Sequence, residues 1–75
     1  MKLAFVMINT VPDQMESDLK KFEKIEGVQE AYMIYGIYDI IAMVKTKTIK
    51  ELNGKILHIR SVKNIKNNLT LNVVK

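Results

Sequence analysis

The chain has 75 residues, no cysteine and a formal net charge of +4. This length limits it to a single domain, residues 1–75, whose small core needs reinforcement from disulfides, metals or association between copies. Because cysteine is absent, disulfides and thiolate metal sites are excluded, and association is expected. No apolar run approaches the roughly 18 residues that span a bilayer, and no cleavable leader is recognisable, so we expect a cytoplasmic protein without a membrane partner.

The positive charge is dispersed along the chain. The 12 basic residues include a single arginine, and lysines alternate with glutamates over the first half. Only residues 58–68, HIRSVKNIKNN, concentrate positive charge. Nucleic-acid recognition favours arginine forks and clustered patches, so a solvated lysine surface is the better interpretation and no direct DNA binding is expected.

The first half of the chain predicts a strand, a helix and a second strand. Residues 3–9, LAFVMIN, are rich in β-forming residues and predict a strand. Residues 13–26 predict an amphipathic helix, with Asp13 and Glu16 as a capping box and Gly27 at the C′ position after its end. Its apolar stripe consists of Met15, Leu19, Phe22 and Ile25. Residues 28–35 predict the second strand.

The second half repeats this alternation. Residues 38–45 predict a third strand, and residues 48–61 a second helix that begins with a capping box of Thr48 and Glu51. The apolar stripe of this helix consists of Ile49, Leu52, Ile56 and Ile59. Residues 65–74 alternate between apolar and polar side chains and predict a fourth strand.

The predicted order is β-α-β-β-α-β, which indicates an α+β, ferredoxin-like fold. In that fold a four-stranded antiparallel sheet carries both helices on one face. The segments LAFVMI and IIAMV are apolar on both faces, whereas a sheet with one wet face should alternate. The face without helices therefore needs a partner, and a second copy is the simplest one. We expect a dimeric, α+β barrel-like assembly.

The turn between the two central strands, YGIYD, raises a question about Asp39. With Gly36 and Ile37 as the two loop residues, Gly36 supplies the positive φ of a type II′ turn. Asp39 would then begin the third strand at the rim of the sheet. From the residues alone, an acid that accepts hydrogen bonds from loop amides is favoured over a ligand contact.

With this turn and strand order, the chain resembles the effector-binding (RAM) domain of the Lrp/AsnC transcription regulators. The G-x-Y-D turn of Gly36, Tyr38 and Asp39, its spacing to the second helix and the place of the last strand carry the resemblance, which covers essentially the whole chain. The resemblance implies transcription regulation, dimers formed through the sheets, rings of dimers such as octamers, and amino acid effectors bound between dimers. The site residues that it implies are Gly36, Ile37, Tyr38 and Asp39 in the turn, and Asn68 and Thr70 on the last strand.

Two departures from the family pattern matter. No helix-turn-helix precedes the first strand, so the resemblance is to a stand-alone form that would act with full-length Lrp/AsnC regulators rather than bind DNA itself. Asn68 stands where the family tends to have a hydroxyl residue. An amide both donates and accepts hydrogen bonds, so a site can persist with a different ligand preference.

Two other functions stay open. One is a small dimeric α+β barrel enzyme of the monooxygenase or isomerase kind, and the other is an oligomerisation module with a vestigial site. The sole histidine, His58, flanks the apolar face of the second predicted helix and is interpreted as a surface residue rather than a general base. We therefore expect no catalytic residue, no metal site and no cofactor.

Overall fold

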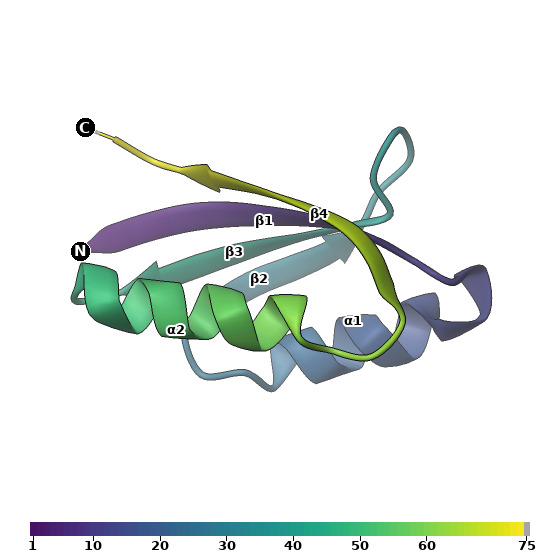
Figure 1. The fold of residues 1–75 in the computed structure, drawn as a ribbon, viewed down its shortest axis with the longest axis horizontal. Coiled ribbons are helices and arrows are strands. Elements are labelled where there is room, and N and C mark those ends of the chain that lie inside the picture. The colour runs from purple at the N-terminus through teal and green to yellow at the C-terminus, as the bar shows by residue number, and fades with distance from the viewer. Residues whose placement is uncertain (75) are drawn as a thin grey trace.

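The computed structural model describes residues 1–74, which form a four-stranded sheet with helices on one side (Figure 1). In chain order the elements are β1 (Lys2–Thr10), the short 3-10 helix η1 (Pro12–Gln14), α1 (Met15–Glu23), β2 (Val28–Met33), β3 (Ile40–Thr46), α2 (Ile49–Arg60) and β4 (Ile65–Asn72). The strand order is β2-β3-β1-β4, and each neighbouring pair is antiparallel. The predicted ferredoxin-like α+β fold is confirmed.

The core lies between the sheet and the two helices. Alternate residues of β1 and β3 point toward the helices and are fully buried: Ala4, Val6, Ile8, Ile40, Ala42 and Val44. Phe22 of α1 and Leu52 and Ile59 of α2 fill the other side of this layer. Full burial of one such large aliphatic or aromatic side chain stabilises a fold by about 1.5–3 kcal/mol.

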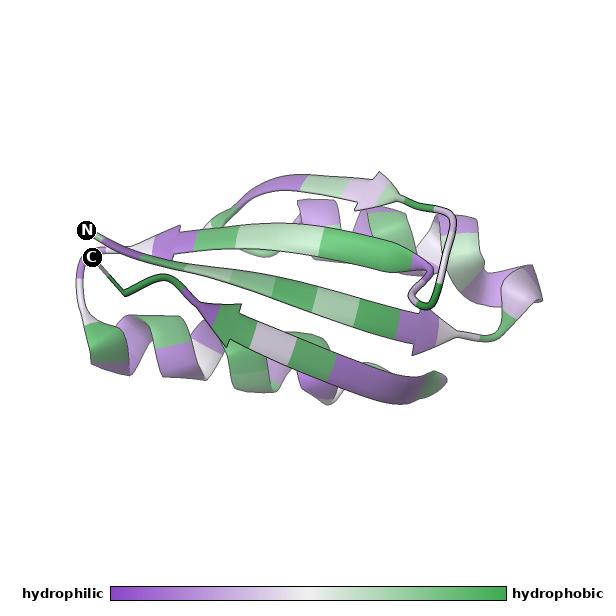
Figure 2. Cartoon of the chain, turned by 90° about the horizontal axis from the view of Figure 1, so that it is seen from above, coloured by the Kyte–Doolittle hydropathy of each residue, from purple (hydrophilic) through white to green (hydrophobic). Residues whose placement is uncertain are grey.

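The opposite face of the sheet carries no helix, and we call it the open face. Between their buried residues, β1 and β3 present half-buried apolar side chains there: Leu3, Phe5, Met7, Ile41 and Met43. Leu69 and Leu71 of β4 pair with Met7 and Phe5 and extend the same surface. Figure 2 views this face and shows hydrophobic segments along all three strands. Both faces of the central strands are therefore apolar, as the sequence predicts.

The two helix starts differ from each other. At α2 half of the predicted capping box is confirmed: the Glu51 amide donates to Thr48 Oγ1 at 3.2 Å, while the Glu51 carboxylate accepts from the Thr48 hydroxyl rather than from its backbone amide. At α1 the predicted box is wrong. Pro12, whose fixed φ suits a first helical turn, begins η1 instead, and the side chain of the residue before α1, Gln14, makes no capping bond.

The end of α1 also differs from the prediction. The helix ends at Glu23 with Lys24 as its C-cap, so Gly27 is not the C′ residue. Gly27 does need its positive φ, +101°, in the turn that leads into β2.

The connection between β2 and β3 is wider than a two-residue turn. The predicted pairing register is correct, since Met33 pairs with Ile40, but the strands stop there and leave a loop from Ile34 to Asp39, which we call the rim loop. Gly36 has a positive φ of +131°, far from the value of about +60° that a type II′ turn requires. The Asp39 amide instead donates to Ile8 O at 2.9 Å, so the base of the loop is fixed to β1.

The two outer strands, β2 and β4, are irregular and polar. Their pairing shifts register between Val28 and Glu30 on one side and between Asn9 and Thr10 on the other. Lys66, Asn67 and Asn68 of β4 are exposed. Within residues 1–74, no helix has the length and apolar character needed to cross a membrane.

Candidate functional site

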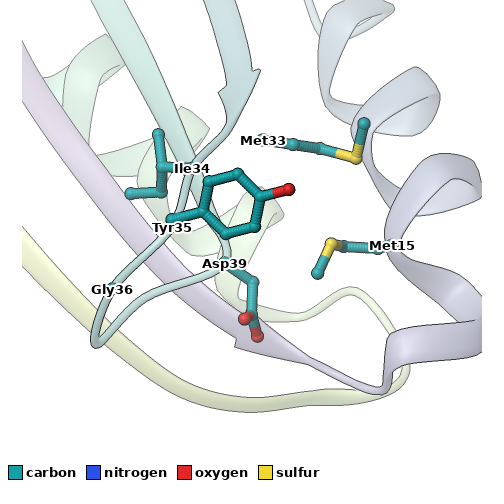
Figure 3. Close-up of a pocket in the computed structure, with 6 residues that line it drawn as sticks. All are labelled: Met15, Met33, Ile34, Tyr35, Gly36 and Asp39. Atoms are coloured by element: carbon teal, nitrogen blue, oxygen red, sulfur yellow. The ribbon is translucent and has the colours of Figure 1, made fainter.

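A hollow of about 410 Å³ opens beside the rim loop. Its lining consists of Met15 of α1, Met33 of β2, and Ile34, Tyr35, Gly36 and Asp39 of the loop. Figure 3 shows the Tyr35 ring beside the two methionines, with the Asp39 carboxyl group on the adjoining wall. Volumes of about 300–1,000 Å³ are typical of small-molecule sites. The hollow is thus an open, largely apolar depression with a single carboxylate, and its Tyr35 side chain is fully exposed.

The two carboxylate oxygens of Asp39 have different surroundings. Oδ2 accepts from the Thr10 amide at 3.0 Å and from Asn9 Nδ2 at 3.3 Å. These donors belong to β1, so Asp39 does accept structural hydrogen bonds, but not from loop amides as the capping interpretation supposed. Among residues 1–74, no hydrogen-bond partner is recorded for Oδ1. One oxygen therefore fixes the loop and the other is available to a ligand.

Asn9 supports the loop at a second point. Its side-chain amide donates to Ile37 O at 2.8 Å as well as to Asp39. Sequence reasoning missed several contributors to this region: Asn9, Thr10, Met15, Met33, Ile34 and Tyr35. The polar pair Asn9 and Thr10 that ends an otherwise apolar strand was the available signal for the first two.

The structure brings together only some of the predicted site residues. Gly36 and Asp39 line the hollow. Ile37, which is 86% exposed, and the half-buried Tyr38 belong to the same loop but are not among the lining residues. Asn68 and Thr70 pair with Ile8 and Val6 on the far side of β1 from the loop, and they do not line the hollow either.

Thr70 nevertheless carries an unusual feature for a predicted site residue. Its Oγ1 is buried and has no hydrogen-bond partner among the described residues. A buried hydroxyl without a partner is uncommon, because the lost hydration is not replaced.

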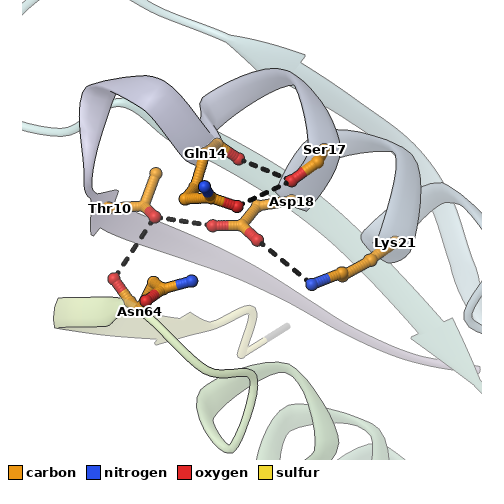
Figure 4. Close-up of polar contacts among 6 residues, drawn as sticks. All are labelled: Thr10, Gln14, Ser17, Asp18, Lys21 and Asn64. Carbon is orange, nitrogen blue, oxygen red and sulfur yellow. Dashed lines mark hydrogen bonds and ion pairs between the residues drawn. The ribbon is translucent and has the colours of Figure 1, made fainter.

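A buried carboxylate lies next to the site, and it was not predicted. Asp18 of α1 is fully buried; its Oδ2 accepts from Thr10 Oγ1 at 2.6 Å, and its Oδ1 lies 3.8 Å from Lys21 Nζ (Figure 4). Thr10 Oγ1 also lies 3.3 Å from Asn64 O. A signal did exist, because Asp18 stands three residues after Met15 and four before Phe22, on the helix face that packs against the sheet.

The chemistry that this site supports is binding of a cation with an apolar body. A carboxylate oxygen without a partner can accept charge-assisted hydrogen bonds from an ammonium group, and the thioethers and the tyrosine ring suit apolar groups. Among residues 1–74, no group of three His, Cys, Asp or Glu side chains is placed to hold a metal ion. His58, on α2, is exposed and does not line the hollow, as its interpretation as a surface residue predicts.

The family model of the Lrp/AsnC ligand binding domain matches residues 3–75. The chain belongs to the Lrp/AsnC family. It is 35% identical over 63 residues to the HTH-type transcriptional regulator LysM of Saccharolobus solfataricus. It is 47% identical over 51 residues to the homocitrate synthase of Sulfolobus acidocaldarius. The structure of E. coli AsnC, 28% identical, superimposes with a TM-score of 0.87 over 99% of this chain and 51% of that one.

This Lrp/AsnC chain corresponds to only part of its curated relatives. The matched segments cover 68% of the chain but 11% of the synthase, and 83% of the chain but 44% of LysM. The shared unit is therefore a ligand-binding domain type found within proteins of different overall length. The regulators among these relatives make the chain a regulator-related module.

Proposed function

We propose that this Lrp/AsnC domain binds an amino acid effector and couples its binding to assembly. The observation that carries the proposal is Asp39, whose Oδ2 is bonded to β1 while Oδ1 has no partner at the wall of an apolar hollow. An α-ammonium group can donate to Oδ1, and an apolar side chain can contact Met15, Met33 and Tyr35. The sequence-predicted residues Ile37, Tyr38, Asn68 and Thr70 complete the site when dimers meet in a ring.

The open face supports the assembly part of the proposal. Leu69 and Leu71 are 40% and 47% exposed and adjoin the half-buried apolar residues of β1 and β3. Two copies that stack their open faces would remove this surface from water as a twofold homodimer. Dimers then associate into a ring, and we favour an octamer. The open face would also let the domain pair with the corresponding domain of full-length Lrp/AsnC regulators. We place this assembly in the cytoplasm.

A non-catalytic role fits better than an enzymatic one. Asp39 is the sole acid among the residues that line the hollow, which hold no histidine or lysine as an acid–base partner. The similarity to homocitrate synthase covers only 11% of that enzyme. It therefore supports a domain that the two proteins share, and it does not support synthase activity in this chain. In this proposal the partner regulators bind DNA and this domain does not.

The test begins with a thermal-shift screen of the wild-type chain against the twenty amino acids, because a ligand that binds only the folded state raises the melting temperature. The amino acid with the largest shift is then titrated calorimetrically into wild type, Asp39→Asn and, as a matched control, the exposed Asp13→Asn. We expect Asp39→Asn to keep its bond from Thr10 and to weaken binding by about 1.5–3 kcal/mol, roughly 10- to 150-fold. Asp13→Asn should bind as wild type does.

Two outcomes would contradict the proposal. If no amino acid raises the melting temperature, the alternative of an oligomerisation module with a vestigial site is favoured. If Asp39→Asn and wild type bind equally well, Asp39 serves only the loop.

A further inference from the structure

A second hollow lies on the helix layer and is unrelated to the rim loop. It has a volume of about 410 Å³ and an apolar floor of Ile25 and Val62. Around this floor stand Lys21, Lys24, Lys55, His58 and Glu26. We call it the helix groove, because α1 with the turn after it and α2 supply the lining.

The lining of the helix groove is basic. Three lysines and one glutamate line it, and with His58 neutral and the Asp18 partner of Lys21 included, the formal charge is +1. Among the described residues, Lys21 pairs with the buried Asp18, whereas Lys24 and Lys55 form no ion pair. The Lys24 and Lys55 ammonium groups therefore stand at the edge of an apolar floor with Glu26 as the carboxylate in the same lining.

Lys55 is also held in place, unlike most surface lysines. It is half-buried, and its side-chain carbons Cγ, Cδ and Cε pack against Gly27, 3.3–3.6 Å from the point where a Cβ would stand. A lysine side chain loses up to about 2 kcal/mol of conformational entropy when it is fixed by a ligand. The contact with Gly27 supplies part of that ordering in advance, so Lys55 presents a pre-positioned ammonium group.

Compensation of helix dipoles does not account for this arrangement. Lysines near a helix C-terminus are favourable there, which explains Lys21 and Lys24. Lys55, however, stands in the interior of α2, six residues after its start at Ile49 and five before its end at Arg60. The dipole effect falls off within the last turn, so it does not explain the position of Lys55.

We propose that the helix groove binds a phosphate monoester with an apolar or aromatic body, such as a nucleoside monophosphate. Lys24 and Lys55 donate to the phosphate oxygens as point charges, and His58 adds a further donor. The body of the ligand lies on Ile25 and Val62. The groove is on the helix side of the sheet, so stacking of the open faces leaves it accessible, and it does not depend on Asp39.

The test is calorimetric titration of the chain with adenosine monophosphate, adenosine, inorganic phosphate and citrate. We expect adenosine monophosphate to bind best, inorganic phosphate more weakly because it lacks the apolar body, and adenosine not at all. Equal binding of citrate and adenosine monophosphate would overturn the preference for phosphate. Absence of binding by both phosphate compounds at millimolar concentration would overturn the site.

Variants separate the groove from the general positive charge. Lys55→Gln should weaken binding of adenosine monophosphate roughly tenfold, the loss expected for one charge-assisted hydrogen bond. Lys2→Gln, at the exposed start of β1, removes the same charge at a residue that does not line the groove, and it should change affinity less than twofold. Equal losses in the two variants would mean that only net charge matters. Circular dichroism and unchanged melting temperatures establish that both variants are folded.

Discussion

Thr10 is held from two directions at the end of β1. Its amide donates to Asp39 Oδ2 of the rim loop, and its hydroxyl donates to Asp18 Oδ2 of α1. These two bonds join the candidate effector site to the helix layer through one residue. Both structural bonds to Asp39 use Oδ2, so the ligand contact that we propose would use Oδ1.

The pair of Tyr32 and Glu30 provides a pH-dependent marker on the open face. Tyr32 Oη donates to Glu30 Oε1 at 2.7 Å, and this hydrogen bond, with the negative charge of Glu30, raises the pKa of Tyr32 above its ordinary value of 10.0. The pair therefore favours the protonated tyrosine of the folded state. Its contribution is complete below about pH 10 and is lost as pH rises through the folded-state pKa.

We expect Glu30→Gln to lower the pKa of Tyr32, because the substitution removes the charge. The measurement is a pH titration of the Tyr32 ring carbons by NMR in wild type and variant. An unchanged midpoint would show that the hydrogen bond does not form in solution.

Two of the residues that line the hollow, Gly36 and Asp39, follow from short-range pattern, and the others do not. Gly36 and Asp39 are recognisable because a glycine turn and a lone acid interrupt two apolar strands. Met15 enters the hollow only through the packing of α1 against the sheet, which pattern does not specify. Asp18 was not singled out, although its spacing from Met15 and Phe22 places it on the buried side of the helix.

At the scale of elements, periodicity was sufficient where local signals agree. The helix α2 follows from its capping box and from Leu52, Ile56 and Ile59, which are buried as expected, whereas Ile49 of the same predicted stripe is 52% exposed at the helix start. The rim loop and the start of α1 were mispredicted for two reasons. The bond from Asp39 to Ile8 joins segments far apart in the sequence, and Pro12 begins a helical turn before the predicted cap.

Gly54 in α2 offers a direct test of helix energetics. A Cβ added there would meet no heavy atom within 4 Å, so Gly54→Ala should stabilise the fold by about 0.5–1 kcal/mol. Gly27→Ala is the matched control and should destabilise, since Gly27 has φ +101° and Lys55 Cγ lies 3.3 Å from the new Cβ. Urea unfolding of the three proteins measures both effects, and destabilisation by Gly54→Ala would contradict the environment described for α2.

At the scale of the whole molecule, the open face gives the sheet two apolar sides but helices on only one. Monomeric proteins rarely expose a large contiguous apolar patch. The sequence predicted this property from the lack of alternation in β1 and β3. It did not show that Leu69 and Leu71 belong to the open face, because that depends on the register of β4 against β1.

Assembly through the open face predicts a selective effect of charge there. Leu71→Glu places a carboxylate beside Phe5 on that face and should convert the dimer into a monomer at micromolar concentration. Leu57→Glu adds the same charge at a residue of α2 that is 62% exposed, and it should leave the assembly intact. Sedimentation velocity reports the masses. A wild-type mass of 8.7 kDa, or equal behaviour of the two variants, would contradict assembly through this face.

The irregular outer strands β2 and β4 limit edge-to-edge addition of further copies to the sheet. A flat strand with unsatisfied backbone groups recruits further strands side by side, and that process has no natural end, as in amyloid fibrils. Here the pairing slips within both outer pairs, and Lys66, Asn67 and Asn68 place polar side chains along β4. Sideways addition is thereby disfavoured, whereas stacking of two open faces, as we propose, would leave no further open face for another copy to bind. We expect the protein to form closed particles of fixed size and to resist fibrillation when concentrated.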